Sequence, residues 1–395
     1  MQKVLEMKKI TWKIQRETKR LVRQLVELPN SVFEYLFLRA FYDYRKPHEM
    51  VVIKGIEPIA AEVAIYLIYA PNGLQKSHFD TLRTLTEENI TPIIVSNLPL
   101  EQTDRELLVQ KSGLVIERPN IGYDFGGYRD AIMQISAKLN DLDRLYILND
   151  SVWMVDSDQS WFSAARATGC EFVGATSNYG TARHNVDVFQ NITWSHSAKH
   201  PNFHYASYAL SIGDRILKNP KFLSYWKKFH LTNSKKRTIK RGEIGLTQWV
   251  LKHGYEHCAT CEVAKIDTEM ASLDDISLDF VARNLVIPED LRLIDILDRV
   301  LKSDPTSEKG RHDRYNVILM AVARQSIGYA LPYFNLHYKN FQFIKKSPLK
   351  LSRRGAEATL QIMAELDGPM AKHALIEAQQ LFGEREDVQQ VVSKS

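Results

Sequence analysis

The chain has 395 residues, of which 44% are hydrophobic, and a formal net charge of +5. This length suits two domains or one large domain with appendages, and the hydrophobic fraction can fill a substantial core. Three cysteines are too few for a disulfide scaffold, the first residues lack the pattern of a signal peptide, and Arg324 interrupts the longest apolar stretch. We therefore expect a globular cytoplasmic protein.

Residues 1–50 are expected to form a basic amphipathic helical region. Residues 1–28 carry eight Lys or Arg against three Glu. On a helix the apolar side chains form one narrow stripe with the basic side chains beside it. The stripe consists of Ile10, Ile14, Leu21, Leu25 and Leu28, and the basic residues are Lys9, Lys13, Arg16, Arg20 and Arg23.

Two interpretations fit residues 1–28. The helix packs on its own protein with a solvated basic face, or it makes a peripheral contact with anionic lipid on the inner face of the cytoplasmic membrane. We expect no nucleic-acid partner, because the basic residues come without interleaved aromatic residues that could stack on bases.

Residues 51–284 are expected to form an α/β domain, because short apolar runs alternate with helical patterns. The expected strands lie at 62–70, 91–98, 114–118, 144–150, 171–176 and 205–213, and the expected helices at 74–88, 127–139, 219–229 and 242–254. Continuous apolar strands separated by helices predict a parallel sheet covered on both faces. Residues 285–395 are expected to be mostly helical, and they contain no motif to which we can assign chemistry.

Polar residues and glycines follow the expected strands, where sheets of this kind bind ligands. They are Tyr69, Ser96, Asn97, Asn120, Gly122, Gly126, Gly127, Asn149, Asp150 and Ser151. A glycine-rich turn between a strand and a helix lets backbone amides approach a phosphate. An ordinary tight turn that binds no ligand would have the same glycine-rich sequence. Asp150, between two neutral oxygen donors, could hold Mg²⁺ or Mn²⁺, or could cap the next segment.

Several of these segments together resemble the rhamnan synthesis protein F family of bacterial polysaccharide glycosyltransferases. The resemblance covers about residues 60–270 and rests on NIGYDFGGYRD, YILNDS, HYASYALSI, NPKFLSYW and GEIGLTQWVLKHGY in this order. It implies a GT-A-like nucleotide-sugar fold and transfer of a deoxyhexose, typically L-rhamnose from dTDP-rhamnose, to a growing cell-surface glycan. GT-A enzymes often carry two acids in an Asp-x-Asp motif, whereas here Asp150 stands alone, which leaves metal dependence open.

The resemblance also suggests roles for individual residues, each with a structural alternative. Asp124 would accept hydrogen bonds from sugar hydroxyls, or it ties its own loop together. Glu243, expected at the start of a helix, would be the general base of an inverting transfer, or it satisfies free helix amides. His204 and Tyr208, expected on one face of a strand, would contact the acceptor sugar, or they belong to a loop and the core.

Two other functional classes fit parts of the sequence. The single acid of the Asn-Asp-Ser segment would also suit a catalytically inactive scaffold that binds a nucleotide sugar without turning it over. The glycine-rich turn alone suggests a dinucleotide-dependent oxidoreductase, but the first strand is followed by YAPNGLQKS and lacks the three spaced glycines that such enzymes use.

Overall fold

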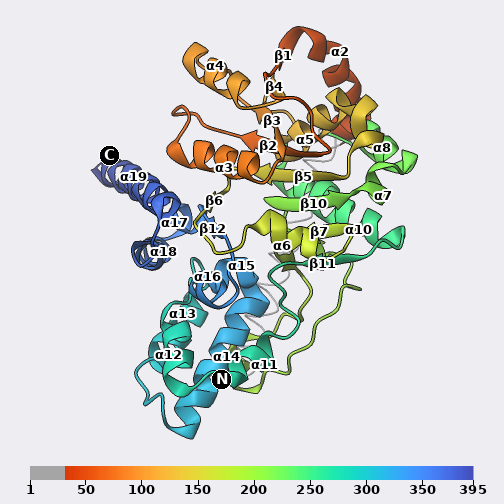
Figure 1. Ribbon diagram of the computed structural model, residues 1–395. Helices are drawn as coiled ribbons and strands as arrows, with labels where there is room; N and C mark the ends of the chain where they lie inside the picture. The colour runs from red at the N-terminus through yellow and green to blue at the C-terminus, as the bar shows by residue number, and fades with distance from the viewer. Residues whose placement is uncertain (1–31, 395) are drawn as a thin grey trace.

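The computed structural model of the chain describes residues 32–394, with side chains described as far as residue 384. Its centre is an eight-stranded mixed sheet of order β1-β4-β3-β2-β5-β10-β7-β11, and two pairs of short strands, β6 with β12 and β8 with β9, lie outside it (Figure 1). The strands are β1 (Val51–Lys54), β2 (Glu62–Ile68), β3 (Thr91–Ser96), β4 (Leu114–Glu117), β5 (Arg144–Asn149), β6 (Val152–Met154), β7 (Phe172–Gly174), β8 (Ser177–Asn178), β9 (His204–Tyr205), β10 (Ala209–Gly213), β11 (His257–Ala259) and β12 (Phe343–Lys345).

Helices cover both faces of this sheet. Those up to residue 283 are η1 (Glu34–Leu38), α2 (Arg39–Glu49), α3 (Lys76–Glu87), α4 (Gln102–Gln110), α5 (Tyr123–Gln134), η2 (Ser136–Asp141), α6 (Trp161–Ala167), η3 (Val186–Asn191), α7 (Asp214–Leu217), α8 (Pro220–Lys227), α9 (Lys235–Ile239), η4 (Lys240–Ile244), α10 (Gly245–Lys252), α11 (Ile266–Ser272) and α12 (Asp275–Arg283). Alternate residues of β2, β3 and β5 pack on α3, α4 and α6 on one face and on α5, α8 and α10 on the other. Because both faces are buried, these strands read as continuous apolar runs.

Beyond residue 285 the chain is mostly helical, as expected. Its helices are α13 (Leu291–Val300), α14 (Glu308–Gln325), α15 (Ile327–Ala330), α16 (Pro332–Tyr338), α17 (Pro348–Leu351), α18 (Arg353–Ala364) and α19 (Pro369–Lys394). Apolar side chains of α12–α16 belong to the same core as the α3 face of the sheet. The residues before and after the expected boundary at residue 285 therefore share one hydrophobic core.

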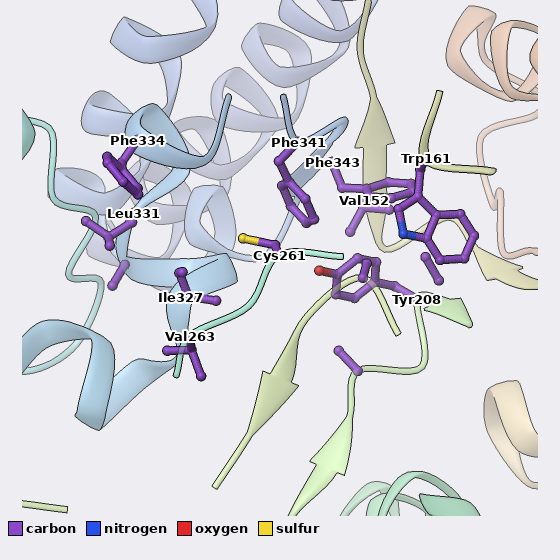
Figure 2. Close-up of a cluster of buried hydrophobic side chains, with 14 of the residues drawn as sticks. Val152, Trp161, Tyr208, Cys261, Val263, Ile327, Leu331, Phe334, Phe341 and Phe343 are labelled. Carbon is purple, nitrogen blue, oxygen red and sulfur yellow. The ribbon is translucent and has the colours of Figure 1, made fainter. Parts of the chain in front are cut away.

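Strand β12 links this helical region to the sheet domain. It pairs antiparallel with β6, so that Phe343 faces Met154 and Lys345 faces Val152. Figure 2 shows Phe343 beside Val152, Trp161 and Tyr208 in one apolar cluster. The ring centroids of Phe343 and Tyr208 lie 5.6 Å apart in an edge-to-face arrangement, which is a favourable aromatic geometry. The sequence pattern did not predict this strand.

The α/β class and the helical C-terminal region are confirmed, but the sheet is mixed and not wholly parallel as expected. Strands β4, β3, β2 and β5 are parallel, but β10 runs antiparallel to both β5 and β7. Residues 1–28 lie outside the described part of the chain, so their amphipathic helix and lipid contact stay predictions. Among the described helices, none is long and apolar enough to cross a membrane.

A buried ion pair joins the end of β4 to helix α5. The Arg118 Nε atom donates to Asp130 Oδ2 at 2.7 Å, and both side chains are fully buried. Asp130 also accepts from the Tyr42 hydroxyl at 2.5 Å and from Lys46 Nζ at 2.8 Å. Burial raises the pKa of Asp130, but the positive charges of Arg118 and Lys46 outweigh it and hold this pKa below its usual range.

We expect Asp130→Ala to lower the free energy of unfolding by about 3–5 kcal/mol, because it leaves the Arg118 guanidinium buried without a counter-ion. Urea denaturation followed by circular dichroism measures this loss. The matched control is Asp214→Ala, which removes an exposed carboxylate paired with Lys218 and should shift the transition little. Similar small shifts for both variants would show that the buried pair does not anchor the fold.

Candidate active site

The candidate site lies at the carboxyl ends of β2 and β5, where the sheet reverses its order of connection. From β2 the chain continues to β3 and β4 on one side and then returns to β5 on the other. In open α/β sheets such a switch point forms a crevice that binds ligands. The structure places Tyr69, Asn149 and Asp150 there, as the sequence predicted.

Asp150 is held at this edge by the neighbouring strand. Its Oδ2 atom accepts a hydrogen bond from the Tyr69 backbone amide at 2.7 Å, and its side chain remains 15% exposed. The buried His78 ring of α3 lies beneath it, with Nε2 3.6 Å from Oδ2. Because His78 Nδ1 accepts from the Gln75 amide, Nε2 carries the proton and faces the carboxylate. His78 was not predicted as a site residue, because the sequence pattern around it is that of an ordinary amphipathic helix.

Asp124 and Asn149 meet across the space between α5 and β5. The Asn149 amide nitrogen donates to Asp124 Oδ2 at 3.2 Å and to the Tyr128 hydroxyl at 2.9 Å. Burial, with further contributions from the negative charges of Asp150 and Glu243, raises the pKa of Asp124 to about 7. Near neutral pH this carboxyl group can therefore both donate and accept hydrogen bonds.

Glu243 lies close enough to Asp124 for its charge to raise the pKa of that carboxyl group. Its carboxylate accepts from the Ser207 hydroxyl at 2.7 Å and lies 3.3 Å from His204 Nε2, and its side chain is 23% exposed. Burial raises the pKa of Glu243, but the contacts with His204 and Ser207 outweigh it and hold the pKa below its usual range. This carboxylate is ionised at neutral pH and reaches solvent.

The expectation that Glu243 begins a helix is wrong. It lies within the π-helical segment η4, which continues α9 and leads directly into α10 with helical backbone angles at both junctions. The free amides of a helix amino end are therefore not available to it. Gly242 makes this position possible, because a Cβ atom there would lie 2.4 Å from the Phe125 ring. Single π turns inside α-helices are frequent at functional sites.

The glycines of the NIGYDFGGYRD segment have a different role from the one expected. Gly122 has a φ of 78° and does form the turn before α5, but Gly126 and Gly127 lie inside the helix. The Gly126 amide donates to the Gly122 carbonyl oxygen and is not free to bind a diphosphate. A Cβ atom on Gly126 would lie 2.1 Å from the Ile121 carbonyl oxygen, and one on Gly127 would lie 2.3 Å from Leu67. Both glycines therefore serve close packing.

The remaining predicted residues stabilise the loops around the site. Asn97 donates to Asn120 and accepts from Arg118, while the Ser96 hydroxyl donates to the Leu98 carbonyl. Ser151 is exposed, and its hydroxyl and backbone amide both donate to Asn149 Oδ1. The bonds of Ser96, Asn97 and Asn120 are thus made within these loops, and none of them involves Asp124, Asp150 or Glu243.

His204 and Tyr208 do not share a strand face, because His204 belongs to β9 and Tyr208 precedes β10. Tyr208 is buried, and its hydroxyl is 2.9 Å from the Thr176 hydroxyl, so its expected contact with an acceptor has no support. His204 is also buried: Nδ1 lies 2.8 Å from the Asn202 carbonyl and Nε2 lies 3.2 Å from the Asn178 amide. These contacts support a role for His204 in orienting Glu243 and give no support to its expected contact with an acceptor sugar.

Two lysines from the C-terminal region, neither of them predicted from the sequence, approach the same site. The Lys345 ammonium lies 3.8 Å from the centroid of the Tyr208 ring. The backbone amide of Lys346 donates to the Ser151 carbonyl oxygen at 3.0 Å. The short run FQFIKK, residues 341–346, does not alternate apolar and polar residues, so the sequence offers no period-two signal of a strand here.

The carboxylates do not form a metal cluster by themselves. Within residues 32–394, no group of three or more His, Cys, Asp or Glu residues is arranged to hold a metal ion. Asp150 supplies one carboxylate, while the Asn149 oxygen is already bonded to Ser151. This set suits a hard cation only where phosphate oxygens and water complete the coordination, as Mg²⁺ sites often require.

A family model described as rhamnan synthesis protein F matches residues 92–293, just over half of the chain. The chain belongs to the rhamnan synthesis protein F family. The matched part contains Asp124, Asp150 and Glu243 but ends well before Lys345. The family expected from the sequence motifs is thus confirmed.

Two further comparisons describe this family member. An uncharacterized protein, y4gN, of Sinorhizobium fredii (strain NBRC 101917 / NGR234) is 34% identical over 240 residues, which are 60% of this chain and 58% of that relative. The chain therefore matches less than two thirds of the relative's length. The crystal structure of the galactosyltransferase LgtC in complex with donor and acceptor sugar analogs is 11% identical and aligns with 50% of this chain and 72% of its own, with a TM-score of 0.25. A likeness this weak carries no argument about the site.

We expect Asp124→Asn to make the protein relatively more stable as the pH rises. In the wild type the folded-state pKa is raised, so the unfolded chain ionises first and stability is lost between about pH 4, the ordinary aspartate value, and about pH 7. Asparagine cannot ionise, and its oxygen can still accept from Asn149. Urea denaturation at pH 5 and pH 8 should show the free energy of unfolding of the variant gaining on the wild type.

The exposed carboxyl of Asp158 provides the control for this comparison. The Asp158→Asn variant should follow the wild type at both pH values. A constant difference between Asp124→Asn and the wild type would show that the Asp124 carboxyl is not forced toward its neutral form.

Proposed function

We propose that this protein is a GT-A-like glycosyltransferase that moves a deoxyhexose, L-rhamnose from dTDP-rhamnose, to a growing bacterial cell-surface polysaccharide or lipopolysaccharide with inversion at the sugar carbon. Its membership of the rhamnan synthesis protein F family supports polysaccharide synthesis. The observation that carries the proposal is the convergence of Asp124, Asp150 and Glu243 from three different elements at the switch point of the sheet.

Glu243 is the proposed general base. An inverting transfer needs a group that takes the proton of the acceptor hydroxyl as that oxygen attacks the sugar carbon. Glu243 is ionised, partly exposed and fixed by Ser207 and His204, so it can accept a proton without first changing its position. Because the Glu243 carboxylate is largely buried, water screens its charge only weakly. It therefore interacts strongly with a positive charge that develops nearby.

Asp124 and Asp150 are proposed to hold the donor sugar. Near neutral pH the Asp124 carboxyl can donate to one sugar hydroxyl and accept from another, and Asn149 fixes its orientation. Asp150 is the residue that would bind Mg²⁺ or Mn²⁺. When bound, such an ion would neutralise charge on the diphosphate leaving group.

We expect Asp150→Ala to reduce transfer by on the order of 100-fold, the scale of losing one electrostatic partner of the transition state. The fold should persist, because the side chain is partly exposed and its nearest contacts are the Tyr69 amide and His78. Release of dTDP from dTDP-rhamnose with a glycan acceptor measures the rate, and thermal shift measures donor binding. If chelation abolishes wild-type activity and Mn²⁺ restores it, Asp150 acts through a metal.

The same experiment separates the enzyme from an inactive scaffold. A scaffold would show a thermal shift with the nucleotide sugar but no release of dTDP above background. Wild-type turnover by Asp150→Ala would reject the assignment of the site.

We expect Glu243→Gln to lower turnover strongly while donor affinity and melting temperature stay near wild type. Glutamine keeps the size and the hydrogen bond from Ser207 but cannot take a proton. Since the pKa of Glu243 is lowered, protonation of the base should reduce the wild-type rate at low pH, below the usual range of glutamate. This acidic limb should be absent from the residual activity of the variant.

Glu256→Gln, at an exposed position between α10 and β11, is the matched control and should keep the full rate. If Glu243→Gln also keeps the full rate, the base lies elsewhere, and Asp124 is the next candidate because it faces the same space.

A further inference from the structure

The C-terminal strand β12 completes the site edge that β5 and β6 begin. Asn149, Asp150 and Ser151 connect these two strands, and β12 pairs along β6 immediately beyond them. The Lys346 backbone amide donates to the Ser151 carbonyl oxygen, which extends the pairing to the Asp150 loop. Phe343 and Ile344 are buried in two different apolar clusters, so the backbone of β12 is fixed on both sides.

Lys345 and Lys346 project from opposite sides of this strand toward the site. Lys345 lies over the Tyr208 ring, with the Tyr329 ring 5.5 Å from its ammonium. The Lys346 ammonium lies 5.1 Å from the Trp153 ring. Aromatic faces hold an ammonium in place but neutralise little of its charge.

In the described part of the chain, neither ammonium forms an ion pair within 4.0 Å of a carboxylate. Burial lowers the pKa of Lys345 to about 8, and the charges of Glu243 and Asp124 only partly offset it. Burial likewise lowers the pKa of Lys346, with Asp150 and Glu377 acting in the opposite direction. A partly buried cation without a counter-ion is unfavourable unless an anion joins it.

We infer that Lys345 and Lys346 bind the diphosphate group of a nucleotide diphosphate ligand at the carboxyl edge of β5. The inference rests on the proposed function for the identity of the ligand, and it assigns the binding of the leaving group to residues outside the part of the chain that the family model matches. The three carboxylates of the site would repel a diphosphate. The two lysines supply the opposing charge, and their aromatic neighbours keep both ammonium groups aimed at the site.

The lysines also have a role in the reaction. When the acceptor oxygen forms its bond to the sugar carbon, the bond from that carbon to the diphosphate oxygen breaks, and the electron pair stays on the diphosphate. The Glu243 carboxylate takes the proton of the acceptor. Fixed ammonium groups at the diphosphate stabilise the negative charge that develops there.

Calorimetric titration with dTDP, dTMP and inorganic pyrophosphate tests the inference. The test variants are Lys345→Met and Lys346→Met, which keep a side chain of similar length without the charge. The exposed Lys350 of α17 provides the matched control, Lys350→Met. We expect each test variant to bind dTDP at least 10-fold more weakly than the wild type, and the control to bind as the wild type does. The loss should be smaller for dTMP, which lacks the second phosphate.

Lys345→Arg distinguishes loss of the charge from disruption of the fold at this position. It keeps the charge and should retain dTDP binding. Pyrophosphate binding that is lost in both methionine variants would support recognition of the diphosphate alone, without the nucleoside. If the wild type binds dTDP and the methionine variants bind it within twofold of that affinity, this inference is overturned while the proposed function stands. If no nucleotide diphosphate, tested as dTDP, UDP and GDP, binds the wild type, the proposed function itself fails.

Discussion

The buried ion pair between Arg118 and Asp130 is the constraint on which the site geometry depends. Arg118 follows β4 and Asp130 lies in α5, so the pair fixes the helix to the end of a strand. The same guanidinium donates to the Asn97 side chain and to the Ile121 carbonyl, which sets the path of the chain into the Gly122 turn. The first turn of α5 then brings Asp124 within hydrogen-bond distance of Asn149. One shielded charge pair thus determines where a titratable group of the site lies.

The ionisable groups of the site are coupled because they share a region that water reaches only partly. Burial, with the charges of Asp150 and Glu243, drives Asp124 toward its neutral form, whereas His204 and Ser207 keep Glu243 ionised. Two neighbouring carboxyl groups therefore differ in pKa, Asp124 being raised and Glu243 lowered. This division is what acid and base functions require of neighbouring carboxyl groups. It results from burial of Asp124 and from the hydrogen-bond partners of Glu243.

The sequence predicted those features that depend on local pattern. The buried strands β2, β3 and β5 were recognisable as continuous apolar runs, and the order of strands and helices placed Asp150 and Asn149 at one edge. The glycine-rich segment was less informative, because Gly126 and Gly127 have low helix propensity and yet lie in α5. Their close contacts with Ile121 and Leu67 outweigh that propensity. Glu243 was expected at a helix start because the local sequence does not reveal that α9, η4 and α10 form one continuous helical segment.

The two lysines at the end of β12 were beyond any local pattern, because they reach the site through pairing with residues far away in the sequence. This strand pair has a consequence for the order in which the protein matures during synthesis. A nascent chain that ends at Val300 already contains every strand of the eight-stranded sheet, but it lacks α14 on one face and both lysines at the edge. Since chains fold progressively as they emerge from the ribosome, the sheet and its carboxylates can form before the lysines arrive. The site is therefore complete only after the C-terminal region has been synthesised and has paired with β6. Until then the chain holds the acids of the site without the cations that face them.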